Sequence, residues 1–136
     1  MKKVSYFLLL SLFIAIGIFL DLVPIRVPDG VDKVCHFLGF VVITFVAIST
    51  FVSFYGKKSL DYFLMFLLTF GSLFAGLSEF VQKFVSIREC DAGDWLTNLL
   101  GITLVVAITY LVNSKERRTA ELNEGYFDFK DLPASS

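Results

Sequence analysis

The sequence lacks several residue patterns that identify particular classes of enzyme and binding protein. Its two cysteines, Cys35 and Cys90, form no CxxC or zinc-type spacing. It contains no P-loop, no zinc-type motif and no Ser-His-Asp motif, and it shows no internal repeat or low-complexity tract. Its net charge of -1 is nearly neutral, and no basic patch is interleaved with aromatic residues. Because nucleic-acid binding needs such a patch, we expect no nucleic-acid partner.

The sequence is, in contrast, rich in apolar residues. Of its 136 residues, 56% are hydrophobic and 16 are phenylalanine. The mean hydropathy is +0.74. Soluble domains have only about 45–50% apolar residues. The composition therefore indicates a membrane protein that is in contact with a lipid bilayer.

Four apolar runs are long enough to cross a membrane as helices. They cover residues 4–20, 34–55, 62–84 and 95–113. The first run also resembles a secretory signal peptide, but the small residues Ala15 and Gly17 lie inside it and not at its end, which favours a retained helix. A loop with two prolines follows the first run, and a short turn at residues 56–59 follows the second.

Lysine and arginine are distributed unequally between the predicted loops. On the side of the two termini, seven lie in the short loop or close to the ends of the predicted helices: Lys2, Lys3, Lys57, Lys58, Lys115, Arg117 and Arg118. Four, diluted by seven acids, lie on the other side. Because cytoplasmic loops carry the excess of these residues, we predict that both termini are cytoplasmic. The predicted fold is all-α: a polytopic transmembrane four-helix bundle of residues 1–114 in the cytoplasmic (inner) membrane. A polar tail at residues 115–136 is predicted to be disordered.

A polar stretch at residues 79–98 covers the end of the third run, the loop that follows and the start of the fourth run. Glu79 and Gln82 are three residues apart, and Asp94 and Asn98 are four apart, so each pair shares one face of a helix. Polar groups that lie partly below the membrane surface are costly, so a function is the default hypothesis. The predicted topology places all the binding candidates on one extracytoplasmic face: Asp32, Lys33, His36, Glu79, Gln82, Arg88, Asp94 and Asn98.

Two motifs in this region resemble the VanZ-like family of small bacterial membrane proteins. The first opens the second predicted helix and reads Asp32-Lys33-x-x-His36-Phe37. The second comprises Glu79, Gln82, Arg88, Asp94, Asn98 and Gly101. The family takes its name from a protein associated with teicoplanin resistance. The resemblance therefore implies a role in the cell envelope, with glycopeptide resistance as one form of it, but it implies no catalytic mechanism.

Two residues are candidates for catalysis, and each has a structural alternative. His36 can act as an acid, a base or a metal ligand near neutral pH. Alternatively, it is a first-turn histidine that bonds to a loop carbonyl. Glu79 is a candidate general base. Alternatively, it forms a structural ion pair with Arg88 or Lys83.

The other polar residues also allow more than one interpretation. Asp94 lies at the start of an apolar run, where its carboxylate can cap the helix and interact favourably with the helix dipole. Asn98 and Gln82 can simply form hydrogen bonds between helices. Arg88 is the best candidate for binding an anion, because its guanidinium can hold a phosphate or carboxylate through two bonds. Small residues at helical spacing are expected to pack helices together: Gly71, Ser72, Ala75, Gly76 and Gly101.

Three classes of function remain open. The first is a non-enzymatic envelope protein whose outward polar pocket binds an anionic headgroup, a lipid-linked cell-wall precursor or a peptide carboxylate. The second is a membrane enzyme that uses His36 and Glu79, with a divalent metal held by Glu79, Asp91 or Asp94. The third is a purely structural module. We rank binding first and a transporter last, because no charge lies in the middle of a predicted helix.

The two cysteines fall on the same predicted extracytoplasmic side. Cys35 lies at the start of the second helix, and Cys90 lies in the outer loop. They either form a disulfide in this oxidising environment or remain two unrelated thiols.

Overall fold

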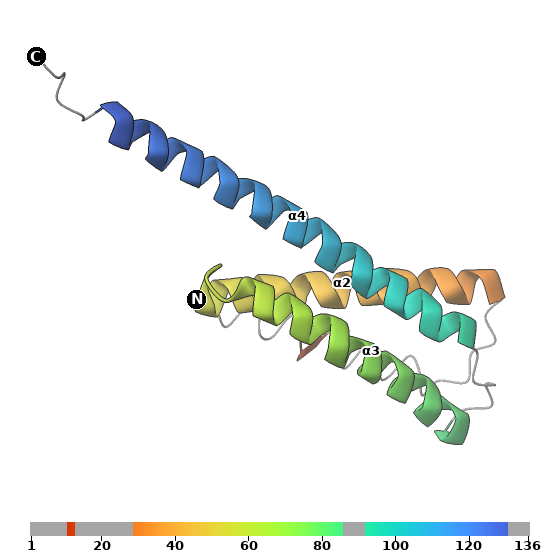
Figure 1. Ribbon diagram of the computed structural model, residues 1–136. Coiled ribbons are helices and arrows are strands. Elements are labelled where there is room, and N and C mark those ends of the chain that lie inside the picture. Colours follow the sequence, from red (N-terminus) through yellow and green to blue (C-terminus); the bar gives the residue numbers. More distant parts are fainter. Residues whose placement is uncertain (1–10, 13–28, 86–91, 131–136) are drawn as a thin grey trace, which may run out of the picture. The chain divides into compact units, whose positions relative to one another are not determined.

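The computed structural model describes residues 11–12, 29–85 and 92–130, and within these ranges every regular element is α-helical (Figure 1). Helix α2 spans Asp29–Tyr55, α3 spans Leu60–Val85 and α4 spans Ala92–Lys130. The all-α prediction is confirmed. The first predicted helix, at residues 4–20, falls outside the described residues except for Ser11 and Leu12, so the four-helix bundle stays a prediction.

All three helices contain a segment that is long and apolar enough to cross a membrane. These segments are Gly30–Tyr55, Leu60–Ser78 and Ala92–Asn123, and 18-residue stretches within them have mean hydropathies of 2.3, 1.7 and 1.9. A helix of 26 residues, such as α3, is about 39 Å long, whereas the hydrocarbon core of a bilayer is about 30 Å thick. Length and composition therefore agree with the predicted membrane class.

The helices also expose large apolar side chains. Phe45 is 62% exposed, Leu73 is 65% exposed and Leu100 is 63% exposed. An apolar surface of this kind is unfavourable in water, whereas lipid tails solvate it. The large apolar side chains exposed on the described helices are therefore suited to contact with lipid.

Helices α2 and α3 form a hairpin that is closed by the predicted turn (Figure 1). Gly56 has a φ of 73°, and its N–H donates to the carbonyl of Val52 at 2.9 Å. Glycine adopts this left-handed conformation without steric cost, which is why it ends α2 here. The N–H of Leu60 then donates to the carbonyl of Lys57 at 3.2 Å as α3 begins.

The core lies where α2, α3 and the first part of α4 meet. The chain divides into two compact units, Met1–Val106 and Ala107–Ser136, and this packing belongs to the first. All three helices contribute buried apolar residues to the core: Ile48, Leu60, Leu64, Ala75, Ile102, Val105 and Val106. On α4 the buried residues recur every three or four positions, as one face of a helix requires.

Gly71 and Gly101 allow α3 and α2 to pack closely against α4. A Cβ atom added at Gly101 would lie 2.8 Å from the carbonyl oxygen of Phe37 and 3.2 Å from the Cβ of Phe40. A Cβ atom added at Gly71 would lie 3.2 Å from the Cδ1 of Ile102. The predicted packing role of Gly71 and Gly101 is confirmed. Because a backbone oxygen cannot rotate away, Gly101 sets how closely α2 and α4 approach each other.

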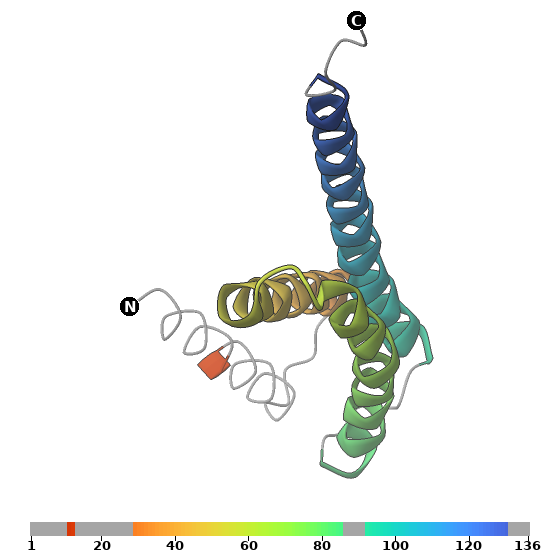
Figure 2. The ribbon, with the colours of Figure 1, turned by 60° about the vertical axis from the view of Figure 1, so that its left-hand side comes forward.

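Helix α4 corrects the prediction of a disordered tail from Lys115. It is one uninterrupted helix to Lys130, and its continuous ribbon can be followed in Figure 2. The hydroxyl of Thr119 donates to the carbonyl of Lys115 at 3.0 Å within this segment. The segment is polar but contains Lys, Glu, Arg and Ala, which are strong helix formers. Since the preceding apolar turns already supply the unfavourable start of the helix, these residues only have to extend it.

Candidate functional site

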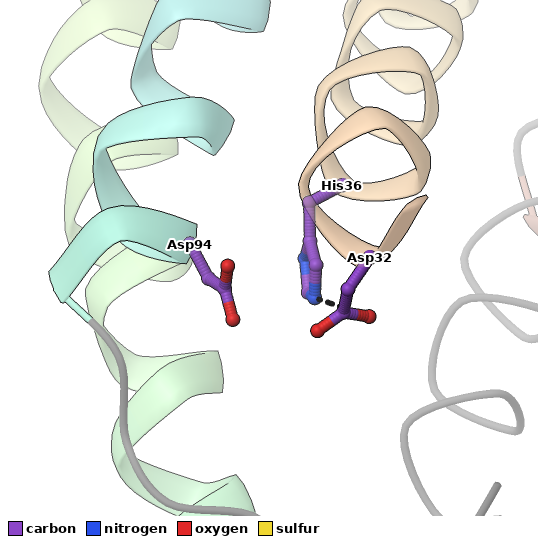
Figure 3. A group of neighbouring side chains, drawn as sticks. All are labelled: Asp32, His36 and Asp94. Atoms are coloured by element: carbon purple, nitrogen blue, oxygen red, sulfur yellow. Dashed lines mark ion pairs between the residues drawn. The ribbon is translucent and has the colours of Figure 1, made fainter. Parts of the chain in front are cut away.

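Three side chains that can act as metal ligands converge at the starts of α2 and α4 (Figure 3). Asp32 and His36 are four residues apart in the first two turns of α2, so they lie on the same face of the helix. Asp94 lies in the first turn of α4. Figure 3 shows the carboxylate of Asp94 directed toward the imidazole of His36 and the carboxylate of Asp32. We call this group the Asp32–His36–Asp94 cluster.

The donor atoms of the cluster lie close together. One imidazole nitrogen and one oxygen from each carboxylate are all within 4.8 Å of one another. The Nε2 atom of His36 is 3.9 Å from the Oδ1 atom of Asp32, which is too long for a hydrogen bond. The side chains of His36 and Asp32 are 11% and 18% exposed. The cluster is therefore largely buried, and only a small part of these two side chains is exposed.

Lys33 connects α2 to this cluster through Asp94. Its Nζ atom donates to the Oδ1 atom of Asp94 at 3.0 Å, across 61 positions of sequence. The side chain of Asp94 is 10% exposed, whereas that of Lys33 is 39% exposed. A charge-assisted hydrogen bond of this kind offsets part of the cost of burying the carboxylate.

The position of Asp94 in α4 corrects its interpretation as a simple N-cap. Helix α4 begins at Ala92, so Asp94 lies inside the first turn. Its negative charge still stabilises the positive end of the helix dipole. Because the same carboxylate holds Lys33 and faces His36, favouring the dipole is not its only interaction.

Asn98 lies one turn further along α4, on the same face as Asp94. Its side chain is fully buried, and the residue is 0% exposed. Gly101 follows on this face and contacts α2 at Phe37. The buried amide therefore marks the border between the polar cluster and the apolar core. The interhelical hydrogen bond that we expect for Asn98 stays a prediction.

The remaining predicted site residues lie at the end of α3 and in the loop that follows. Glu79 and Gln82 belong to the last two turns of α3, but their side chains lie outside the described part of the structure. Arg88 and Asp91 lie outside the described residues altogether. The pairing of Glu79 with Arg88 or Lys83, and any role of Asp91 as a metal ligand, therefore stay predictions.

The cysteine pairing also stays a prediction. Cys35 is exposed in the first two turns of α2, one position before His36. Cys90 lies outside the described residues.

Sequence reasoning predicted that these side chains lie on one membrane face. It named Glu79, Asp91 or Asp94 as the residues that hold a divalent metal, and it did not group Asp94 with Asp32 and His36. The four-residue spacing of Asp32 and His36 was the available signal, because two ligands so spaced on a helix can converge on one ion.

Comparisons with known proteins define a relative but no activity. No family model matches the chain. No solved structure matches it either. An uncharacterized protein of the yeast Schizosaccharomyces pombe is 30% identical over 114 residues, which cover 84% of this chain. The match covers 66% of that protein, so the chain spans just under two thirds of the length of its relative. Over most of its length, this chain is thus similar to a yeast protein whose name states no function.

Proposed function

We propose that this chain is an integral membrane protein that binds the phosphate-bearing headgroup of a membrane lipid at the starts of α2 and α4. The observation that carries the proposal is the convergence of Asp32, Lys33, His36 and Asp94 on two helices that each contain a long apolar segment. The ends of spanning helices lie at the level of the lipid headgroups. Ionisable groups that are largely buried there are costly, and they are retained mainly where they have a function.

Lys33 is the residue that we assign to the headgroup phosphate. Its side chain is 39% exposed although its ammonium group is bonded to Asp94 at 3.0 Å. An ammonium group carries more than one donor, so a lysine can bond to a carboxylate and a phosphate together. Since Asp94 already orients the lysine, less side-chain freedom is lost when a phosphate binds. Arg88, outside the described residues, is the second anion contact that the sequence predicts.

The proposal includes the predicted orientation. The cluster lies at the starts of α2 and α4, whereas Lys57 and Lys58 lie in the turn at the far end of α2. This separation supports a bundle in which the lysine-rich turn and both termini are cytoplasmic and the cluster is extracytoplasmic. We also propose that the helix predicted at residues 4–20 completes a four-helix bundle in the cytoplasmic (inner) membrane.

Phospholipids and lipid-linked cell-wall precursors share the phosphate chemistry that this site would recognise. The resemblance of the same residues to the VanZ-like family supports a role in the cell envelope. On that basis, teicoplanin resistance would follow if the bound headgroup belonged to a wall precursor. The yeast relative supports a ligand that bacterial and eukaryotic membranes have in common, which favours a phospholipid.

We rank binding above catalysis because the ammonium of Lys33, held by Asp94, supplies a cation for an anionic headgroup. Glu79, the second catalytic candidate, has its side chain outside the described part of the structure. An enzyme that uses His36 and Glu79 is the alternative, and turnover of the bound lipid would identify it.

Binding of short-chain lipids to the purified protein tests the proposal. Tag-free protein in a maltoside detergent is titrated with short-chain phosphatidylglycerol and, separately, with a prenyl pyrophosphate, which represents the wall-precursor headgroup. Loss of a hydrogen bond to a charged group costs about 1.5–3 kcal/mol, so Lys33→Ala should weaken binding about 10-fold or more. Lys33→Arg, which keeps the charge, should retain most of the affinity.

Lys57→Ala is the matched control, because Lys57 is exposed in the turn between α2 and α3. It should bind the lipid as the wild type does. The detergent melting temperature of each variant shows whether it is folded. Equal affinity of wild type and a folded Lys33→Ala variant for both lipids would contradict the proposal.

A further inference from the structure

We infer that Asp32, His36 and Asp94 form a binding site for a divalent transition-metal ion, with Zn²⁺ and Mn²⁺ as the ions that best suit the donor set. We assign the ion to the headgroup phosphate, so the role of the ion rests on the proposed function. Whether the ion binds at all is independent of the proposed function. The site is new relative to the sequence prediction, which grouped Asp94 with Glu79 and Asp91.

The donor set is the first argument. It consists of one imidazole nitrogen and two carboxylate oxygens, all within 4.8 Å of one another. Imidazole favours Zn²⁺ and related ions, and carboxylates also accept Mn²⁺. Bonds of about 2.0–2.2 Å in a tetrahedral site place ligand atoms about 3.4 Å apart. The distances between the three atoms therefore have to shorten by up to about 1.4 Å, which side-chain rotation can supply.

The rigid placement of the two helices is the second argument. Asp32 and His36 are four residues apart on α2, so one helix fixes two of the ligands. The third ligand is fixed by α4, whose distance from α2 is set by the contact of Gly101 with Phe37. A site on packed helices keeps its geometry better than a site on loops. His36 is also the sole histidine of the chain.

Lys33 is compatible with an ion at this site. It bonds to the Oδ1 atom of Asp94 at 3.0 Å, and a carboxylate has a second oxygen that can bind a metal. Outer partners of this kind orient metal ligands in many proteins. Lys33 is therefore a positioning residue for the ligand Asp94.

The charge balance connects the ion to the headgroup. Two carboxylates and a neutral imidazole are balanced by a divalent ion, and Lys33 then leaves the site with a positive charge. Three protein ligands also leave an open coordination position, as in metal sites that bind a substrate. A phosphate oxygen of the headgroup is the ligand that we assign to that position. The ion thus explains why an anion would bind beside two acidic residues.

Titration of the metal-free protein tests the inference. Tag-free protein in detergent is stripped with a chelator and titrated with Zn²⁺, and bound zinc is measured by elemental analysis. We expect one high-affinity Zn²⁺ per chain. Asp32→Asn, His36→Gln and Asp94→Asn should each weaken binding at least 10-fold, since loss of even an outer partner costs about 10–100-fold. Asp61→Asn, in the first turn of α3, is the matched control and should bind as the wild type does.

A cobalt spectrum shows directly whether position 36 contacts the ion. In a Cys35→Ser background, His36→Cys should bind Co²⁺ and develop a thiolate-to-cobalt charge-transfer band that the parent lacks. This variant should also retain Zn²⁺ and lose Mn²⁺, because a thiolate favours the softer ion. Absence of the band in a folded His36→Cys variant, or equal Zn²⁺ affinity of wild type and His36→Gln, would overturn the inference.

The lipid titration, repeated with and without Zn²⁺, separates the inference from the proposed function. If the metal site and the headgroup function are both correct, Zn²⁺ raises the affinity for short-chain phosphatidylglycerol, and His36→Gln removes this increase in affinity. Zn²⁺ binding without lipid binding would leave the metal site in place and contradict the headgroup function. Lipid binding that requires Lys33, in a protein that binds no Zn²⁺, would support the function and overturn the metal site.

Discussion

The ammonium of Lys33 and the carboxylate of Asp94 lie 3.0 Å apart and join the start of α2 to the start of α4. The carboxylate is the more buried partner, since its side chain is 10% exposed. Removal of the lysine leaves this carboxylate without that bond. We therefore predict that Lys33→Met lowers the free energy of unfolding by about 1–3 kcal/mol, less than for a fully buried pair because Lys33 is partly solvated.

Replacement of both partners should be tolerated better than replacement of one. The double variant Lys33→Met/Asp94→Leu removes the buried charge together with its partner, so it should recover most of the lost stability. A double-mutant cycle tests this prediction: the free energy of unfolding in detergent is measured for Lys33→Met, Asp94→Leu and the double variant. Lys57→Met is the exposed control and should change stability by less than about 0.5 kcal/mol. A double variant less stable than either single one would show that the pair is not coupled in this way.

The contact of Gly101 with Phe37 leads to a second prediction. Because a Cβ at position 101 would lie 2.8 Å from a backbone oxygen, Gly101→Ala has to push α4 away from α2. Overpacking of this kind costs about 1–3 kcal/mol. The same shift moves Asp94 away from His36, so Zn²⁺ affinity should fall together with the melting temperature.

Gly39 provides the matched control within α2. A Cβ added there meets nothing within 4 Å. Gly39→Ala should therefore raise helix stability by up to about 1 kcal/mol and leave Zn²⁺ binding unchanged. Equal melting temperatures for the two alanine variants would show that α2 and α4 are not in close contact at Gly101.

The three described helices could be predicted from the sequence because their apolar runs are long and carry no charge near their middle. The turn at residues 56–59 was also recognised, since Gly56 is followed by polar residues. The partner of Asp94 was not predicted. Periodicity identifies which residues share a helix face, but it does not identify what that face contacts. Lys33 lies 61 positions away, and only the packing of α2 on α4 makes it a neighbour.

The segment after Lys115 shows a second limit of sequence reasoning. Its polarity suggested disorder, because it has little apolar surface to bury. Helix formation in this segment depends instead on local propensity and on the apolar turns that precede it. Composition alone therefore underestimated how far α4 extends.

Cysteine labelling tests the proposed orientation. In a cysteine-free background, single cysteines at Asp29 and Gly93 should react with an impermeant reagent in intact cells, with the outer membrane permeabilised if there is one. A cysteine at Lys58 should not react, because the lysine-rich turn is predicted to be cytoplasmic. Labelling at position 58 alone would reverse the orientation and place the cluster in the cytoplasm.

Glu79 and Arg88, whose side chains lie outside the described part of the structure, have two interpretations that mutation can separate. If they form only a structural ion pair, loss of one partner should cost roughly 3–5 kcal/mol, and an apolar double variant should recover both stability and lipid binding. If they contact the ligand, Glu79→Gln and Arg88→Lys should melt close to the wild type but bind the lipid headgroup much more weakly. The reason is that charge and the planar shape of the guanidinium are what a phosphate recognises. Because the proposed site already contains Lys33 on a separate helix, we expect the second result. An apolar double variant with full lipid affinity would remove Glu79 and Arg88 from the site and leave Lys33 and the Asp32–His36–Asp94 cluster to account for binding.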